Sequence, residues 1–203
     1  DVWNIKRKIK QHQKRFFVPP ETSTDMFKYG RVLGKGAYGK VNVAMQKLSS
    51  KLLAVKSINL AKVTHESAIK RITSEKEILK DLRHPNIVKL YECIQDDNLG
   101  YELLFMELCM GGDMLAYLRR RRRLEEPTAK LFMQQLMHAV GYLHEKNIVH
   151  RDIKLENILL SNLGEIKLCD FGVAEILKEI KPGSRAAQRE KLQERTITNE
   201  DGE

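Results

Sequence analysis

The chain has 203 residues, enough for one large domain or two small ones, and 42% of them are hydrophobic, so it can bury a core. Its 36 Lys and Arg against 27 Asp and Glu give a formal net charge of +9, which favours acidic partners such as nucleotides but indicates no fold. Cys93, Cys109 and Cys169 have no metal-ligand spacing and their odd number suggests a reducing compartment, while no run of ~18 apolar residues predicts a transmembrane helix.

A basic segment, residues 1–23, opens the chain and ends at Pro19-Pro20. Ile5 and Ile9, four residues apart, indicate a helix that the prolines would stop. The segment is either a solvated extension or a docking segment for a lobe or a partner. Because the chain starts with Asp rather than Met and its first segment is charged, we expect no signal peptide, and the chain can be a fragment.

A glycine-rich stretch follows a strand predicted over residues 27–33. It reads Gly34-Lys35-Gly36-Ala37-Tyr38-Gly39-Lys40-Val41, after which Val41, Val43 and Met45 alternate as a second strand. Dinucleotide-binding Rossmann folds share the G-x-G-x-x-G spacing, but there the loop opens a helix. Strand residues resume at once here, so we predict a hairpin whose glycines let the backbone approach phosphates closely.

A lysine interrupts the third predicted strand, residues 52–58. A buried ammonium group at Lys56 is costly unless nucleotide phosphates and a carboxylate pair it; a lysine that points to solvent is the alternative. Residues 66–82 are predicted to form a helix, and position 75 lies on its apolar stripe, three residues after Ile72. Glu75 is therefore predicted to face inward and pair with Lys56.

Further strands are predicted at residues 88–94 and 103–106, and helices at 114–120 and from Glu125-Glu126-Pro127 onward. Five successive arginines, residues 119–123, usually lie on a solvated helix end, although a patch for an acidic substrate or nucleic acid is the alternative. The later helix has an apolar stripe that should pack beneath the loop that follows it. The stripe consists of Met133, Leu136, Val140 and Leu143.

A short loop then combines an acid, a base and an amide. His150-Arg151-Asp152 is followed by Asn157, and a later strand ends in Asp170-Phe171-Gly172. These are the H-R-D-x-x-x-x-N and D-F-G motifs of protein kinases. Over residues 27–174 the chain resembles the eukaryotic serine/threonine protein kinases. Lys154, two residues after the catalytic aspartate, is typical of these enzymes rather than of tyrosine kinases.

The resemblance implies an α+β, two-lobed protein-kinase-like fold, with an antiparallel five-stranded N-lobe sheet plus a helix and an incomplete helical C-lobe. We expect a basic N-terminal extension at 1–23, the N-lobe at 24–107, a partial C-lobe at 108–180 and a polar tail at 181–203. His84-Pro85-Asn86-Ile87-Val88-Lys89-Leu90 and Gly111-Gly112-Asp113 resemble the calcium/calmodulin-dependent and AMP-activated branch.

The implied reaction is transfer of the γ-phosphoryl group of Mg-ATP to a Ser or Thr hydroxyl of a protein, which depends on positioning and charge neutralisation. Asp152 would accept the hydroxyl proton, and Asn157 and Asp170 would bind magnesium through oxygen. Lys56 would hold phosphates and pair with Glu75. The implied catalytic set is Asp152, Lys154, Asn157, Lys56 and Glu75.

The resemblance also implies where ATP lies. Met106 would be the gatekeeper, the Glu107 carbonyl and the Cys109 N–H would meet the adenine edge, and Asp113 would meet the ribose. Val41, Ala54 and Leu159 would sandwich the ring. The implied nucleotide contacts are Leu33, Gly34, Lys35, Gly36, Ala37, Tyr38, Gly39, Val41, Ala54, Lys56, Met106, Glu107, Cys109, Asp113 and Leu159. Cys109 and Cys169 are interpreted as small buried side chains rather than reactive thiols.

The resemblance ends near residue 174. A kinase should continue to A-P-E and D-x-W-x-x-G, but Trp3 is the only tryptophan and Pro182 the only proline after Pro127. Residues 185–195 could form a short helix. Two alternatives stay open: a catalytically impaired ATP-binding scaffold or pseudokinase, and a basic nucleic-acid-binding module, which would lack any aromatic-interleaved basic motif.

Three further expectations concern behaviour. Glu156, four residues after Asp152, is similar to an acid of basic-directed kinases, so we expect a preference for Arg or Lys before the target residue. The chain is expected to be cytoplasmic or nuclear, with no membrane partner. Taken alone it should be marginally stable, because only four apolar side chains of its tail could cover the exposed stripe of the long helix. These are Ile176, Leu177, Ile180 and Leu192.

Overall fold

The computed structural model describes residues 2–16, 22–36, 38–96 and 100–177, with side chains to residue 11 in the first range. Predictions for Ala37, for Pro19-Pro20 and for the tail after residue 177 lie outside these residues. The first described element is helix α1, Val2–Phe16, which agrees with the helix indicated by Ile5 and Ile9. Ile5 is buried, whereas Trp3 is 64% exposed.

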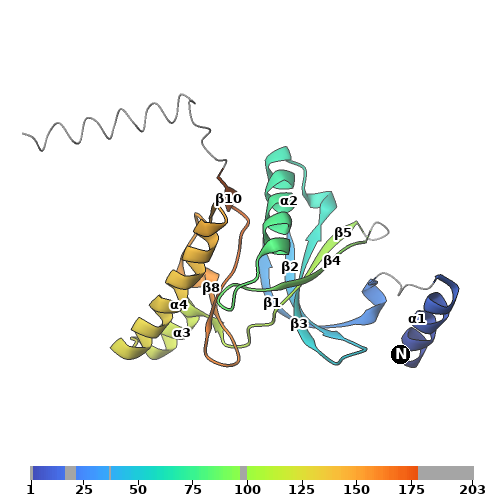
Figure 1. Ribbon diagram of the computed structural model, residues 1–203, viewed down its shortest axis with the longest axis horizontal. Coiled ribbons are helices and arrows are strands. Elements are labelled where there is room, and N and C mark those ends of the chain that lie inside the picture. The colour runs from blue at the N-terminus through green and yellow to red at the C-terminus, as the bar shows by residue number, and fades with distance from the viewer. Residues whose placement is uncertain (1, 17–21, 37, 97–99, 178–203) are drawn as a thin grey trace, which may run out of the picture.

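A five-stranded antiparallel sheet forms the first half of the fold (Figure 1), and its strands have the order β1-β2-β3-β5-β4. The strands are β1 Phe27–Gly36, β2 Gly39–Gln46, β3 Leu52–Asn59, β4 Leu90–Asp96 and β5 Tyr101–Met106. The expected five-stranded N-lobe sheet is confirmed, as is the hairpin at the glycine stretch.

Several strand boundaries differ from the predicted ones by one to three residues, and hydrogen bonding explains two of the differences. β1 continues to Gly36 instead of ending at Leu33, because Gly36 pairs with Gly39 across the hairpin. β4 starts at Leu90 rather than Val88, because the Val88 N–H donates to the Leu168 carbonyl outside this sheet (2.9 Å).

Helix α2, Glu66–Asp81, lies beside the sheet (Figure 1) and contacts β4. Its buried side chains are Ala68, Ile72, Glu75, Ile78 and Leu79. Four of these five are apolar, and Ala68, Ile72, Glu75 and Leu79 follow one another at intervals of four, three and four residues, as the face of an amphipathic helix requires. The inward orientation predicted for Glu75 is therefore confirmed.

The second half of the fold contains two helices and short strands. Its elements are β6 Gly112–Asp113, α3 Met114–Arg121, α4 Glu126–Glu145, β7 Ile148–Val149, β8 Ile158–Leu160, β9 Ile166–Leu168 and β10 Glu175–Ile176. β6, β8 and β9 form one small sheet, and β7 pairs with β10. Short 3-10 helices occur in both halves: η1 Thr24–Met26 and η2 Leu60–Lys62 belong to the first half, and η3 Leu155–Asn157 belongs to the second. Figure 1 shows α3 and α4 at the opposite side of the molecule from α1.

Local sequence explains where the two helices begin. The Asp113 carboxylate accepts a hydrogen bond from the Ala116 N–H at 2.7 Å and caps α3. Pro127 lies in the first turn of α4, where its missing N–H costs nothing. Arg119 to Arg121 form the exposed last turn of α3, which agrees with the solvated interpretation of the arginine run and equally with a patch for an acidic partner.

One apolar core joins the two halves. Ile58 of β3 and Leu79 of α2 belong to the same buried cluster as Leu143 of α4, Leu168 of β9 and Phe171. On the other face of the sheet, Phe27 and Phe105 stack with ring centroids 4.0 Å apart. No helix in the described ranges is long and apolar enough to cross a membrane.

The predicted apolar stripe of α4 is partly wrong. Leu143 is buried and Leu136 and Val140 are half-buried, but Met133 is 57% exposed. The side that packs on the core begins instead at Phe132. Since each residue turns a helix by about 100°, Met133 is rotated away from that side.

Candidate active site

Lys56 on β3 and Glu75 on α2 form a bidentate ion pair. The Lys56 Nζ lies 2.6 Å from Glu75 Oε1 and 2.7 Å from Oε2. The Glu75 side chain is 6% exposed and that of Lys56 is 30% exposed. The pairing predicted from helix geometry is present, and the ammonium group keeps one further N–H to donate toward solvent or an anion.

The segment Asp170-Phe171-Gly172 lies next to this ion pair. A Cβ atom placed on Gly172 would be 3.3 Å from Asp170 Oδ1 and 3.8 Å from Glu75 Oε2. Asp170 has a φ of 63°, and it is exposed whereas Phe171 is fully buried. The buried ring therefore anchors a turn that leaves Asp170 exposed and puts Gly172 close to the Glu75 carboxylate.

His150 connects this turn to the loop that contains Asp152, Lys154 and Asn157. Its Nδ1 accepts the Asp152 N–H at 3.3 Å, so Nε2 carries the proton and donates to the Cys169 carbonyl at 3.0 Å. The ring is 3% exposed and meets Phe171 edge-on at 4.8 Å. Burial lowers the pKa of His150 below its ordinary value, more than the hydrogen bond to the Cys169 carbonyl raises it, which keeps this neutral tautomer at pH 7.

Asp152, Lys154 and Asn157 meet at one carboxylate oxygen. Lys154 Nζ lies 2.8 Å from Asp152 Oδ2, and Asn157 Nδ2 donates to the same oxygen at 2.9 Å. The Lys154 hydrogen bond is the main cause of the lowered pKa of Asp152; burial opposes it and the Asn157 amide adds to it. The carboxylate is therefore ionised at neutral pH, and both bonds leave Oδ1 accessible as an acceptor.

Strand register shows which residues lie opposite those predicted to line the nucleotide site. Val41 lies opposite Lys56 across β2 and β3, and Ala54 lies opposite Met106 across β3 and β5. In the small sheet, Leu159 lies opposite Asp113. Leu33 is 40% exposed on β1. The residues that the resemblance assigns to ATP thus come from two sheets that flank the β5–β6 connection.

The glycines of the hairpin differ in what surrounds them. A Cβ atom on Gly39 would be 1.7 Å from the Ser57 carbonyl oxygen, whereas one on Gly34 or Gly36 would meet nothing within 4 Å. Gly39 is therefore needed for the close approach of β2 and β3. Gly34 and Gly36 leave open backbone, as a phosphate-binding turn requires. Tyr38 lies at the tip, as expected, and its side chain is half-buried against the main core.

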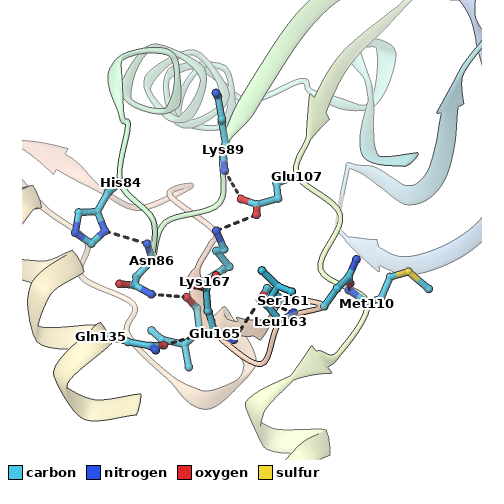
Figure 2. A network of polar contacts seen from close by, with 12 residues as sticks. His84, Asn86, Lys89, Glu107, Met110, Gln135, Ser161, Leu163, Glu165 and Lys167 are labelled. Carbon is cyan, nitrogen blue, oxygen red and sulfur yellow. Dashed lines mark hydrogen bonds and ion pairs between the residues drawn. The ribbon is translucent and has the colours of Figure 1, made fainter. Parts of the chain in front are cut away.

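The predicted hinge, residues 107–113, is named for its resemblance to the segment between kinase lobes, and hydrogen bonds and an ion pair tie it down on its outer side (Figure 2). Glu107 Oε1 lies 2.9 Å from Lys167 Nζ, and its Oε2 accepts the Lys89 N–H at 3.3 Å. The Met110 N–H donates to the Asn162 side chain at 3.2 Å. These bonds use the Glu107 side chain and leave its main-chain carbonyl for other partners.

The two thiols near the site have raised pKa values. Burial is the main cause that raises the pKa of both Cys109 and Cys169 to about 12, so both are protonated at neutral pH. Cys93 is also a free thiol, whose pKa burial raises above its ordinary value. The interpretation of Cys109 and Cys169 as small buried side chains agrees with this.

The donor set near Lys56 fits Mg-ATP. Asp170 offers a carboxylate, and the Asn157 hydrogen bonds use only its amide nitrogen, so the amide oxygen can bind a cation. Among the described residues no group of three His, Cys, Asp or Glu side chains gathers as a metal site. Magnesium is compatible with such a sparse set, because it usually keeps waters and substrate phosphates among its ligands.

Sequence reasoning missed two contacts around the site. Arg151, with a φ of 65°, donates from Nε to the Val173 carbonyl at 2.6 Å and pairs with Glu175. Lys167, which is 8% exposed, pairs with Glu107. The only sequence signal for Lys167 was a charged residue between the apolar Ile166 and Leu168; nothing marked Glu175.

Comparison with known proteins places these features in one family. Residues 27–198 match the protein kinase domain. The chain is 40% identical over 149 residues to NUAK family SNF1-like kinase 1 of Homo sapiens, which covers 73% of this chain and 22% of that protein. It is 40% identical over 147 residues to Aurora kinase of Schizosaccharomyces pombe, covering 72% of this chain and 41% of the relative.

A third relative is the cAMP-dependent protein kinase catalytic subunit of Dictyostelium discoideum, at 36% identity over 168 residues, 81% of this chain and 26% of the relative. The chain therefore spans between about a fifth and two fifths of the length of these relatives. Kinases with three different names match at similar identity, so these values do not separate one branch from another.

Proposed function

Because the chain belongs to the protein kinase family, we propose that it transfers the γ-phosphoryl group of Mg-ATP to serine and threonine hydroxyls of proteins. The observation that carries the proposal is the Lys56–Glu75 ion pair with the Asp170-Phe171-Gly172 turn directly beside it. Both parts must be in place for phosphoryl transfer in this family.

Each proposed role follows from a contact of the side chain. Asp152 accepts the hydroxyl hydrogen of the substrate on Oδ1, because Lys154 and Asn157 occupy Oδ2. Lys154 and Asn157 hold that carboxylate in orientation. Lys56, held by Glu75, donates to phosphate oxygens. Bound magnesium supplies charge neutralisation at the phosphates, and Asn157 and Asp170 are its proposed ligands.

Adenosine binding is assigned to the β5–β6 connection. The Glu107 carbonyl and Cys109 N–H would bind the adenine edge, beside Met106. The Oδ1 atom of Asp113 already accepts the hydrogen bond that caps α3. The other carboxylate oxygen of Asp113 would therefore be the one that binds the ribose. We assign the N-lobe to residues 24–107 and the partial C-lobe to 108–180, with the segments 1–23 and 181–203 outside them.

The test is transfer of label from γ-labelled Mg-ATP to a degenerate Ser/Thr peptide pool. We expect magnesium-dependent label on Ser and Thr, and a raised magnesium requirement for Asp170→Asn because one carboxylate ligand is removed. Saturable Mg-ATP binding by calorimetry without any transfer would favour the ATP-binding scaffold instead. If the folded chain shows no magnesium-dependent binding of ATP at millimolar concentration, both the kinase and the ATP-binding scaffold are contradicted.

Substrate preference is proposed from one exposed acid. Glu156 lies on η3, four residues after Asp152, and its side chain is exposed. It would attract Arg or Lys on the N-terminal side of the target residue. A peptide-array profile should show this preference and lose it in Glu156→Gln; an acidic or proline-directed profile would contradict it.

A further inference from the structure

A cationic pocket lies behind the predicted hinge, away from the residues assigned to catalysis. It has a volume of about 290 Å³ and is lined by Arg83, His84, Pro85 and Lys89 of the α2–β4 connection, together with residues of β4, β9 and the hinge. Figure 2 shows Lys89 and Lys167 beside Glu107, with His84 farther away, beyond Asn86. None of the proposed catalytic side chains lines it.

The residues that line the pocket carry a net positive charge. Arg83, Lys89 and Lys167 contribute three positive charges, and Glu107 is the only carboxylate among the lining residues. Glu107 is already engaged by Lys167 Nζ and by the Lys89 N–H. The lining therefore keeps an excess of two positive charges, and the exposed head groups of Arg83 and Lys89 hold most of it.

His84 adds a neutral donor. Its Nδ1 accepts the Asn86 N–H at 3.0 Å (Figure 2), so its proton lies on Nε2. Burial, followed by the neighbouring His138 and Lys167, lowers the pKa of His84 below its ordinary value, which keeps it neutral at pH 7. The guanidinium group of Arg83 is held in place because its Nη1 donates to the Leu82 carbonyl at 2.7 Å, and it keeps further N–H groups for a ligand.

We propose that this pocket binds the phosphate group of a phosphorylated serine or threonine in a peptide. Such a phosphate carries about −1.5 to −2 charges at pH 7 and three acceptor oxygens, which matches the excess charge and the donors of Arg83, Lys89 and His84. A carboxylate would neutralise only half of that charge. Tyr91, 38% exposed, and Pro85 supply apolar surface at the same pocket for the residues that flank the phosphate.

The experiment measures binding of the full chain to a fluorescent pool of peptides with one central phosphoserine and random flanks, in the absence of ATP. The same pool with serine in that position is the reference. We expect tighter binding of the phosphoserine pool. The variant Arg83→Gln/Lys89→Gln should weaken that binding roughly tenfold or more, because two charge-assisted contacts to phosphate are removed.

The matched control is Arg120→Gln/Lys130→Gln, which removes one Arg and one Lys that are exposed elsewhere, including one of the arginine run. It should bind like the parent chain, and thermal melts of both variants establish that they are folded. Equal binding of the two pools, or equal loss in the control variant, would overturn the proposal.

Competition experiments distinguish a phosphoserine peptide from other ligands of the pocket. Mg-ATP should leave peptide binding unchanged, because Glu107, which both sites use, would meet adenine through its main-chain carbonyl while its side chain lies on the side of Lys89 and Lys167. Displacement by Mg-ATP would contradict the assigned location. Inorganic phosphate should compete only at much higher concentration than unlabelled phosphoserine peptide. Equal competition would mean that the pocket binds free phosphate, and stronger competition by a single-stranded oligonucleotide would mean that it binds nucleic acid.

Discussion

At the scale of single residues, the Lys56–Glu75 pair combines two separable roles. Glu75 is 6% exposed, so Lys56→Met leaves a buried carboxylate without its partner. We expect a loss of about 3–5 kcal/mol in the free energy of unfolding, together with loss of phosphoryl transfer. The double variant Lys56→Met/Glu75→Leu should recover much of the stability and none of the transfer. Denaturant unfolding and turnover measure the two effects; a fully stable single variant would show that the pair is not buried.

His150 predicts a dependence of stability on pH. Its pKa in the folded chain lies below the ordinary 6.5 because the ring is buried. The unfolded chain therefore binds the proton first, and stability is lost as pH falls below about 6.5 toward the folded pKa. His84 contributes in the same direction. The melting temperature should fall between pH 7 and pH 5, and the fall should be smaller in His150→Gln. An equal fall in that variant would assign the effect elsewhere.

A site residue could be predicted when a sequence pattern linked it to its partner. It could not be predicted when the two residues meet only in the folded structure. Glu75 followed from a helical period and the cost of an unpaired buried lysine. The Lys167–Glu107 and Arg151–Glu175 pairs join residues far apart in sequence. No periodicity connects such residues, so only the folded arrangement reveals them.

At the scale of elements, the glycine hairpin provides a matched pair of substitutions. Gly39→Ala would place a Cβ 1.7 Å from the Ser57 carbonyl oxygen, so β2 and β3 must separate. We expect a loss of at least about 1–3 kcal/mol in the free energy of unfolding. Gly34→Ala meets nothing within 4 Å and should leave stability within about ±0.5 kcal/mol of the parent chain. Equal melting temperatures for the two variants would contradict the packing of the hairpin.

Hydrophobic periodicity did not predict which side of helix α4 is buried. Its start at the acidic residues and Pro127 was predicted from local rules for helix termini. Its buried side was not, because Leu131, Met133 and Met137 are exposed although they are as apolar as the residues of the buried side. A helix with apolar residues on more than one side does not identify its core face by sequence.

At the scale of the whole molecule, the exposed apolar side chains of α4 predict self-association. Leu131, Met133 and Met137 are 50%, 57% and 59% exposed, and large apolar side chains exposed near one another favour association. The chain should bind an apolar-surface dye and associate as its concentration rises. Changing all three residues to Gln should reduce both effects without lowering the melting temperature, whereas Leu136→Gln, at a half-buried position, should lower it. Unchanged dye binding in the triple variant would place the apolar surface elsewhere.

The arrangement of the two halves was predicted through motifs rather than through physics alone. Hairpin, ion pair and catalytic loop each followed from residue chemistry. That one apolar cluster runs from the sheet through α2 to α4 and Phe171 depends on long-range packing, which composition and periodicity do not specify.

The central claim is that Asp152 acts on the substrate hydroxyl and not on the nucleotide. It is tested most directly by measuring turnover and the ATP dissociation constant of Asp152→Asn under the same conditions. We predict a fall in turnover of about 10²- to 10⁴-fold with an unchanged dissociation constant for Mg-ATP. Near-normal turnover in Asp152→Asn, or a loss of turnover that follows a matching loss of ATP affinity, would contradict the account.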